Sequence, residues 1–163
     1  MSFWETLFRL LFPKKKRWNP SGKSTKEDRQ NRHGSKNDRT TVDDQTDYPN
    51  HQGAKRIIEK VLDGAQNQLG APNRYAGQSP AEGFDCSGLV YFVFGRAGIK
   101  VRRPSYLQAK EGIGINIQQS EPGDLVYFSH NGVEINHVGI VVSRINEPLS
   151  MIHASSSKGV VQT

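Results

Sequence analysis

The chain has 163 residues and a mass of 18.2 kDa, which is enough for one domain of ordinary size and a tail. Its single cysteine excludes an intramolecular disulfide framework and a multi-cysteine metal site. A formal net charge of +6 and a pI near 9.5 indicate affinity for an anionic surface, whether membrane, nucleic acid or acidic polymer. Much of the excess positive charge lies in residues 9–39, so it describes the N-terminal part more than the remainder.

Residues 1–18 combine an apolar segment with a basic cluster at 14–17. Glu5 and Arg9, the only charges before Pro13, are four residues apart and would share one face of a helix that ends at this proline. We expect this segment to lie on an anionic membrane surface; docking on a partner or packing on the domain are the alternatives. It is too short to span a bilayer, and its basic cluster follows the apolar run, unlike that of a signal peptide.

Residues 19–52 are polar and charged and nearly free of apolar side chains. Such a segment cannot bury enough surface to offset the entropy lost on ordering. The sequence therefore predicts a disordered charged linker between the N-terminal segment and a folded domain over residues 53–163.

From Ala54 the pattern becomes that of a folded domain, beginning with a helix. Apolar residues at three- and four-residue steps predict an amphipathic helix that ends near Gly70. A second helix is predicted over 86–97, closed by Gly98, and a short third one around 106–110. Strands are predicted, between turns, at 125–128, 138–142, 150–154 and 160–161. Helices followed by a strand meander predict an α+β domain with an antiparallel sheet.

The one cysteine, Cys86, stands where the second helix should begin. Asp85 or Ser87 can cap that helix and place the thiol in its first turn. There the helix dipole and the unpaired backbone N–H groups favour the thiolate. The alternative is that Cys86 is a small buried hydrophobe.

Two histidines supply candidate bases for this thiol. His137 and His153 fall within predicted strands, and adjacent antiparallel strands could bring their imidazoles side by side, facing the cysteine helix. A thiol nucleophile needs a base and a third polar group that fixes the tautomer of the base. The other histidines lie in the linker or in a loop and are weaker candidates: His33, His51 and His130.

Residues 54–162 resemble the NlpC-type cysteine peptidases, a family of bacterial cell-wall endopeptidases. The resemblance rests on five sequence blocks that occur in the family's order. They are the nucleophile block at 84–90, an Arg-x-Ser-x-x-Gln block at 103–108 and the block that opens the sheet at 122–128. The block that carries the base follows at 136–141, and the block that carries the orienting residue follows at 151–155. Each block alone is weak evidence, and together they are a strong signal.

The resemblance implies a papain-like fold, with N-terminal helices packed on an antiparallel sheet. It makes Cys86 the nucleophile, His137 the base and His153 the orienting residue. The implied substrate is a peptidoglycan stem peptide, cut after a γ-linked D-glutamate through a thioester, with backbone N–H groups near Cys86 stabilising the oxyanion. In this family the residues matching Asp85 and Ser87 help to bind the amino end of the substrate; Asp85 could equally be only a helix cap.

Two departures from the family pattern affect these expectations. Asn73 stands where the family usually has a tyrosine, and Tyr75 occupies the second aromatic position. Either Tyr75 substitutes as a substrate contact or that contact is missing. The sequence also ends at Thr163, where family domains often carry one more strand, so we expect a weaker sheet or an edge that a partner pairs.

The leading hypothesis is a cysteine endopeptidase that hydrolyses peptidoglycan peptides. The alternatives are an amidase or acyltransferase of the same fold with a lipid or non-wall substrate, and an inactive binding module, against which the complete set of Cys86, His137 and His153 argues. We expect no cofactor, no metal and no nucleic-acid partner. We expect synthesis in a bacterial cytoplasm and action at the cell envelope after export or release, with association to a membrane surface through residues 1–18.

Overall fold

The computed structural model describes residues 4–9 and 51–163, which belong to one structural unit. The predicted linker at 19–52 lies outside the described residues except at its end, where His51 and Gln52 begin the first helix. The basic cluster at 14–17 also lies outside them. No helix within the described ranges is long and apolar enough to cross a membrane.

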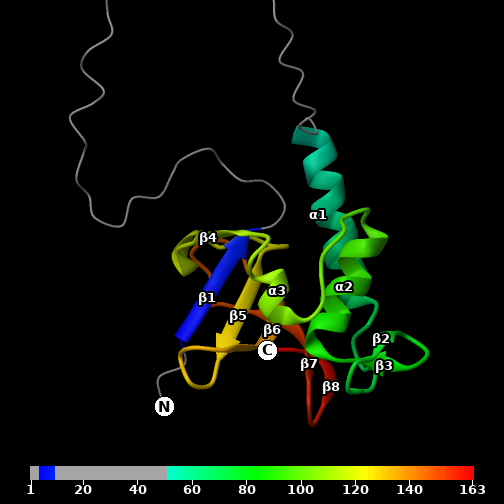
Figure 1. The fold of residues 1–163 in the computed structure, drawn as a ribbon. Helices are drawn as coiled ribbons and strands as arrows, with labels where there is room; N and C mark the ends of the chain where they lie inside the picture. Colours follow the sequence, from blue (N-terminus) through cyan, green and yellow to red (C-terminus); the bar gives the residue numbers. More distant parts are fainter. Residues whose placement is uncertain (1–3, 10–50) are drawn as a thin grey trace, which may run out of the picture. The chain divides into compact units, whose positions relative to one another are not determined.

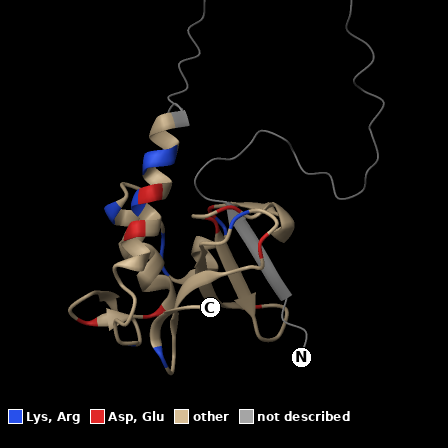
Figure 2. Cartoon of the chain, turned by 180° about the vertical axis from the view of Figure 1, so that it is seen from behind, with Lys and Arg blue, Asp and Glu red and all other residues tan. Residues whose placement is uncertain are grey.

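The three helices predicted after the linker are present and lie beside the sheet (Figure 1). The first, α1 (His51–Gln66), begins three residues before its predicted start and carries charged side chains of both signs along its length (Figure 2). Its face toward the core includes the fully buried Val61 and Ala65. The second helix, α2 (Cys86–Arg96), is followed by Ala97 and by Gly98 at a φ of 90°, a left-handed conformation that favours glycine. The short α3 is Ser105–Gln108.

The main sheet has the strand order β4-β1-β5-β6-β7-β8, and every pair of neighbours is antiparallel. The sequence predicted four of these strands. The bounds are Trp4–Arg9 (β1), Ile113–Ile115 (β4), Leu125–Ser129 (β5), Ile135–Val141 (β6), Met151–Ser155 (β7) and Gly159–Gln162 (β8). The loop before α2 adds a small hairpin of β2 (Gln78–Ser79) and β3 (Gly83–Phe84), and a 3-10 turn spans Ile117–Gln119.

The N-terminal segment differs from its sequence-based expectation, because Trp4–Arg9 forms β1 instead of a helix. This strand lies between β5 and β4, with Trp4 opposite Ser129 and Arg9 opposite Ile113. A short isolated helix is costly to nucleate, whereas a strand between two others pairs its backbone on both sides. The helix prediction is therefore wrong over these six residues.

The sheet places its apolar side chains on two faces in alternation. Leu125 and Tyr127 of β5 are buried in the main core, which also holds α1 and α2, while Val126 lies in a smaller cluster with Val141. The main core takes alternate residues of β6 and β7 as well, namely Val138, Ile140, Ile152 and Ala154. Because side chains alternate along a strand, His137 and His153 face the other side of the sheet.

Candidate active site

Asp85 positions Cys86 by capping α2. The backbone of Asp85 is extended (φ −87°, ψ 174°), and its side-chain Oδ1 accepts a hydrogen bond of 2.6 Å from the backbone N–H of Gly88. The backbone N–H of Leu89 is bound by the carbonyl of Asp85. The backbone N–H groups of Cys86 and Ser87 lie beside the thiol and, with that of Val138, act on its sulfur so as to lower its pKa. They are therefore close enough to the reacting atom to act as donors there.

The loop that precedes Cys86 packs closely against the first turn of α2. A Cβ atom added at Gly88 would lie 1.9 Å from the carbonyl oxygen of Gly77, so only glycine fits there. The backbone N–H of Asp85 donates to the same Gly77 carbonyl at 3.1 Å. The helix start and the loop around Gly77 are therefore held as one unit.

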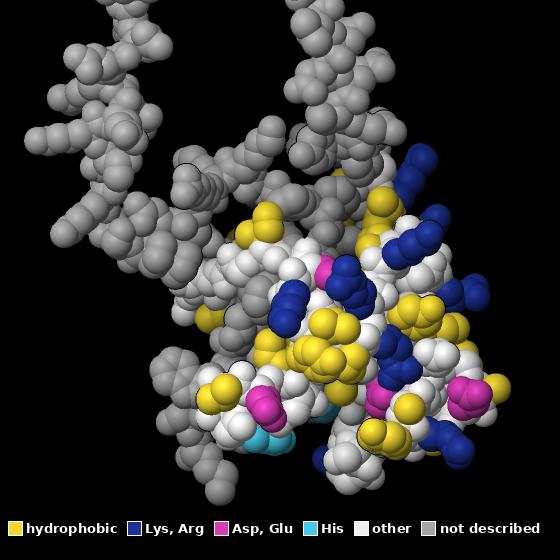
Figure 3. All heavy atoms as spheres, in the orientation of Figure 1, with side chains coloured by type: hydrophobic (Ala, Val, Ile, Leu, Met, Phe, Trp, Pro, Cys, Tyr) yellow, Lys and Arg dark blue, Asp and Glu magenta, His cyan; other side chains and the backbone are white. Residues whose placement is uncertain are grey.

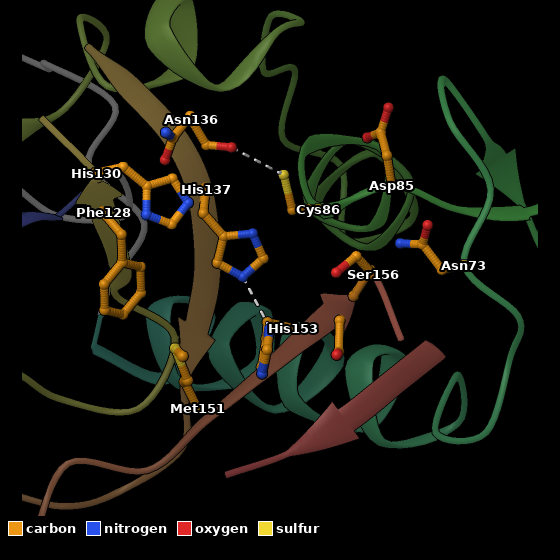
Figure 4. A pocket seen from close by; sticks show the side chains of 12 residues that line it. Asn73, Asp85, Cys86, Phe128, His130, Asn136, His137, Met151, His153 and Ser156 are labelled. Carbon is orange, nitrogen blue, oxygen red and sulfur yellow. Dashed lines mark hydrogen bonds between the residues drawn. The ribbon is translucent and has the colours of Figure 1, made fainter. Parts of the chain in front are cut away.

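A β-bulge brings β6 to the thiol. The register between β5 and β6 shifts after the pair Phe128–His137, so that Ser129 pairs with Ile135 and Asn136 is the extra residue. The Sγ atom of Cys86 donates to the backbone carbonyl oxygen of Asn136 at 3.9 Å (Figure 4). The thiol thus contacts the residue directly before His137.

The two histidines are hydrogen-bonded to each other, with 2.8 Å between Nε2 of His137 and Nδ1 of His153. Their rings are nearly perpendicular, at 89°, and the Phe128 ring lies 5.9 Å from that of His137. In Figure 4 the second ring nitrogen of His137 lies on the side of the ring that faces Cys86. His137 is therefore placed between the thiol and His153.

A cavity of about 580 Å³ opens at this position. Its lining includes four residues that the sequence singled out for the site, namely Asp85, Cys86, His137 and His153, together with Asn73. The other two predicted contacts are not part of the lining. Ser87 is buried and its hydroxyl donates to Asp85 at 3.0 Å, while Tyr75 is 95% exposed on the preceding loop.

The environment makes both reacting groups neutral. Burial, and after it the charge of Asp85, raises the pKa of the Cys86 thiol, although backbone N–H groups act in the opposite direction. The N–H groups at the helix start thus favour the thiolate, as expected, but burial and the charge of Asp85 outweigh them in the free protein. Burial, and after it the charges of His153 and His130, lowers the pKa of His137 to about 4, and burial lowers the pKa of His153. At neutral pH the site holds a thiol beside a neutral imidazole.

Sequence reasoning assigned no role to Arg103, although this residue opens one of the recognised blocks. Its guanidinium forms an ion pair with the Asp85 carboxylate through Nη2, while Nη1 donates to the carbonyl of Ala76 at 3.2 Å and to Oε1 of Gln78 at 3.0 Å. Gln108 is fully buried, and its Nε2 donates to the carbonyl of Ser87 at 3.0 Å. The signals in the sequence for such a role were the charge of Arg103 and the place of both residues in the Arg-x-Ser-x-x-Gln block.

His130 is a second residue that the sequence analysis ranked too low. Its position in the loop between β5 and β6 made it a weaker candidate, but it lines the cavity. Histidine side chains are visible on the face shown in Figure 3, over which basic side chains are scattered. Among the described residues, no group of three or more His, Cys, Asp or Glu side chains is arranged to hold a metal ion.

Comparison with known proteins identifies the family. The model of the NlpC/P60 family matches residues 70–163, which is more than half of the chain. The chain belongs to the NlpC/P60 family. NlpC/P60 domains have the papain-like fold, so the predicted fold class and family are both confirmed.

The relatives of this chain include proteins named as a hydrolase and an endopeptidase. The chain is 33% identical over 108 residues to the gamma-DL-glutamyl hydrolase of Bacillus subtilis and 38% identical over 92 residues to the bifunctional muramidase/DL-endopeptidase CwlT of the same species. These alignments cover 64% and 55% of this chain but only 25% and 28% of the two relatives. The chain thus matches about a quarter of each relative's length.

Solved structures of NlpC/P60 proteins share the fold of this chain. The peptidoglycan hydrolase RipB of Mycobacterium tuberculosis superimposes with a TM-score of 0.59 at 28% identity, covering 70% of this chain and 61% of RipB. RipD of the same species, a non-catalytic NlpC/p60 domain protein, shares the fold at 24% identity with a TM-score of 0.56, over 66% of this chain and 86% of RipD. The family therefore contains both peptidoglycan hydrolases and non-catalytic members.

Proposed function

We propose that this chain is a cysteine peptidase that hydrolyses γ-D-glutamyl peptide bonds in peptidoglycan stem peptides through a thioester on Cys86. The observation that carries this proposal is the grouping of Cys86, His137 and His153 around one cavity, with the two imidazoles hydrogen-bonded at 2.8 Å. The relatives named as a gamma-DL-glutamyl hydrolase and a DL-endopeptidase support the substrate class.

In the first half of this reaction, the free ring nitrogen of His137 takes the proton of Cys86 while Sγ attacks the scissile carbonyl carbon. The backbone N–H groups of Cys86 and Ser87 donate to the oxyanion that forms. His137 then gives its proton to the leaving amine, the C–N bond breaks and a thioester remains. Because His137 starts neutral, it acts as a general base at the moment of attack.

In the second half, His137 takes a proton from water, and the resulting hydroxide attacks the thioester carbonyl. The C–S bond breaks, the acid leaves and the sulfur regains a proton from His137. His153 serves both halves by holding the Nε2 atom of His137 in a hydrogen bond, which fixes the orientation of the ring.

The three predicted substrate contacts differ in their positions relative to the cavity. Asp85 lines the cavity, and a contact with the substrate there stays a proposal. The Ser87 hydroxyl binds Asp85, so any effect of Ser87 on the substrate would pass through that carboxylate. Tyr75 would contact the substrate only beyond the cavity, from its exposed loop.

The test is to incubate the purified chain with peptidoglycan sacculi and to identify the released muropeptides by mass spectrometry, with Cys86→Ala as the control. We expect new fragments that end in a γ-linked D-glutamate, and none from Cys86→Ala. Fragments that persist with Cys86→Ala would exclude Cys86 as the nucleophile. Binding to sacculi without any cleavage would instead support a non-catalytic module, and cleavage of lipid or ester substrates alone would support an amidase or acyltransferase.

Membrane association through residues 1–18 also stays a proposal, and the basic cluster at 14–17 offers a test that leaves β1 intact. We expect the full chain to sediment with anionic liposomes and a variant with four glutamines at 14–17 to sediment less. Equal sedimentation of the two proteins would contradict a role for the basic cluster.

A further inference from the structure

The cavity extends past His137 to the side that lies away from Asp85. Three side chains line it there, namely Phe128, His130 and Met151. Figure 4 shows them on the far side of the His137 ring from Asp85, with the side chain of His130 extending toward that ring. Asp85 is the only acidic residue among the described residues that line the cavity. The side beside the base is therefore a separate surface that carries no carboxylate.

The loop that carries His130 is held in place by Asn131. The Oδ1 atom of this asparagine accepts hydrogen bonds from the hydroxyl of Ser129 at 3.0 Å and from the backbone N–H groups of Val133 and Glu134 at 3.0 and 2.9 Å. Ser129 is itself buried at the end of β5, so the turn is joined to the sheet. His130 therefore reaches the cavity from a turn whose shape is fixed by its own hydrogen bonds.

Phe128 and Met151 form an apolar wall beside His130. Both are half-buried and pack against the smaller core cluster that holds Val126. Met151 also lies over Gly139, where an added Cβ atom would come within 2.5 Å of the Met151 sulfur. Because apolar groups displace water and reduce screening, a hydrogen bond to an ionised group is stronger beside such a wall than in open solvent.

The chemistry of the proposed reaction says which part of the substrate meets this surface. The leaving amine lies at His137, because this base gives it the proton. The carbon next to that nitrogen bears the carboxyl group of the released residue. A histidine beside the base can donate an N–H to this carboxyl group in either of its protonation states. His130 is within electrostatic reach of the base, because its charge is one of the causes of the lowered pKa of His137, after burial and the charge of His153.

We propose that His130 is a specificity residue that donates to the α-carboxylate of the residue released as the amine. The chain would then prefer stem peptides that end at this residue over peptides that continue through an amide, whose carbonyl oxygen is neutral. This inference rests on the proposed function and refines it, because it names the carboxyl end of the peptide that the site accepts.

The test compares two peptides that differ only at the carboxyl end, L-Ala-γ-D-Glu-L-Lys with a free α-carboxylate and the same peptide as its α-carboxamide. Hydrogen bonds to an ionised acceptor are roughly twice as strong as those to a neutral one, so we expect kcat/KM to be about five- to tenfold higher for the carboxylate. An equal kcat/KM, or a preference for the carboxamide, would overturn the inference and leave the proposed function standing. Cleavage of neither peptide, with sacculi also intact, would overturn both.

Variants within one loop test the part assigned to His130. His130→Ala should remove most of the preference for the carboxylate, and His130→Gln, which keeps an N–H donor, should recover part of it. Val133→Ala is the control, because Val133 lies in the same loop, is 83% exposed and is not part of the cavity lining. It should leave the ratio of the two kcat/KM values unchanged.

The ratio isolates the contact with the carboxylate. Both peptides depend on the same base, so any effect of a variant on the pKa of His137 acts on both rates and cancels in their ratio. A folded His130→Ala protein with the wild-type ratio would refute the role of His130. If that variant does not fold, the wild-type ratio in a folded His130→Gln protein would have the same meaning.

Discussion

Replacing His153 by alanine perturbs the site at its best-defined contact. The substitution removes the partner of the 2.8 Å hydrogen bond to Nε2 of His137 and leaves the thiol and its helix untouched. The bond fixes the orientation of the His137 ring, and an intramolecular hydrogen bond contributes about 0.5–1.5 kcal/mol. At about 1.4 kcal/mol for each factor of ten, its loss lowers kcat by about 2- to 10-fold.

The same substitution has a second, independent effect on the pH profile. His153 is one of the charges that hold the pKa of His137 down at about 4, second only to burial. Without His153 the pKa of His137 should rise toward its ordinary value, so the acid limb of kcat/KM should move to higher pH. A structural role for His153 alone would not move this limb.

The assay is the release of peptide fragments from a soluble γ-D-glutamyl peptide, measured between pH 3.5 and 8 for the wild type, His153→Ala and His153→Asn. Asparagine restores a hydrogen-bonding group, so we expect His153→Asn to recover part of kcat. If His153→Ala keeps both the kcat and the acid limb of the wild type, His153 does not orient the base and the reasoning is refuted.

Three further predictions concern the base and the helix start. In the wild type the acid limb of kcat/KM should lie near pH 4, below the ordinary histidine value, because the base must be neutral to act; a limb near 6.5 would contradict this. The pKa of His137 is lower in the folded than in the unfolded protein, so its contribution to stability is present above the ordinary pKa and is lost as the pH falls. The free energy of unfolding should therefore fall by roughly 3 kcal/mol between about pH 6.5 and pH 4. Urea unfolding should show a smaller fall for His137→Gln, and an identical fall would refute the assignment. Finally, Gly88→Ala should destabilise the protein by about 1–3 kcal/mol or more through its clash with Gly77, whereas Gly95→Ala in the same helix, with open space around it, should be neutral or stabilising. Equal midpoints of thermal unfolding for the two variants would contradict this packing.

Local signals in the sequence were enough to predict the elements that carry the nucleophile and the histidines. Asp85 before the apolar run and Gly98 after it mark both ends of α2, and the structure uses them as cap and terminus. Alternation in β6 and β7 places His137 and His153 on one face, which is why a sequence reading could expect the imidazoles side by side. These features depend on neighbours within a few residues.

Features that depend on distant contacts were missed or misjudged. The strand Trp4–Arg9 finds its partners in β4 and β5, far along the chain, and its own residues did not decide between a helix and a strand. The pKa of Cys86 depends mainly on burial of the thiol in the folded domain, and this effect outweighs the local effect of the helix start. The pairing of Arg103 with Asp85 likewise joins residues from separate segments.

The central claim is that Cys86 forms the bond to the substrate, and the single cysteine of the chain allows a direct measurement. The thiol is alkylated in steps with iodoacetamide, and its occupancy by intact mass is compared with the remaining rate of peptide hydrolysis. We predict that activity falls in proportion to occupancy, reaches zero at one label per chain, and is protected by substrate. A fully alkylated protein that still hydrolyses the peptide would contradict the account.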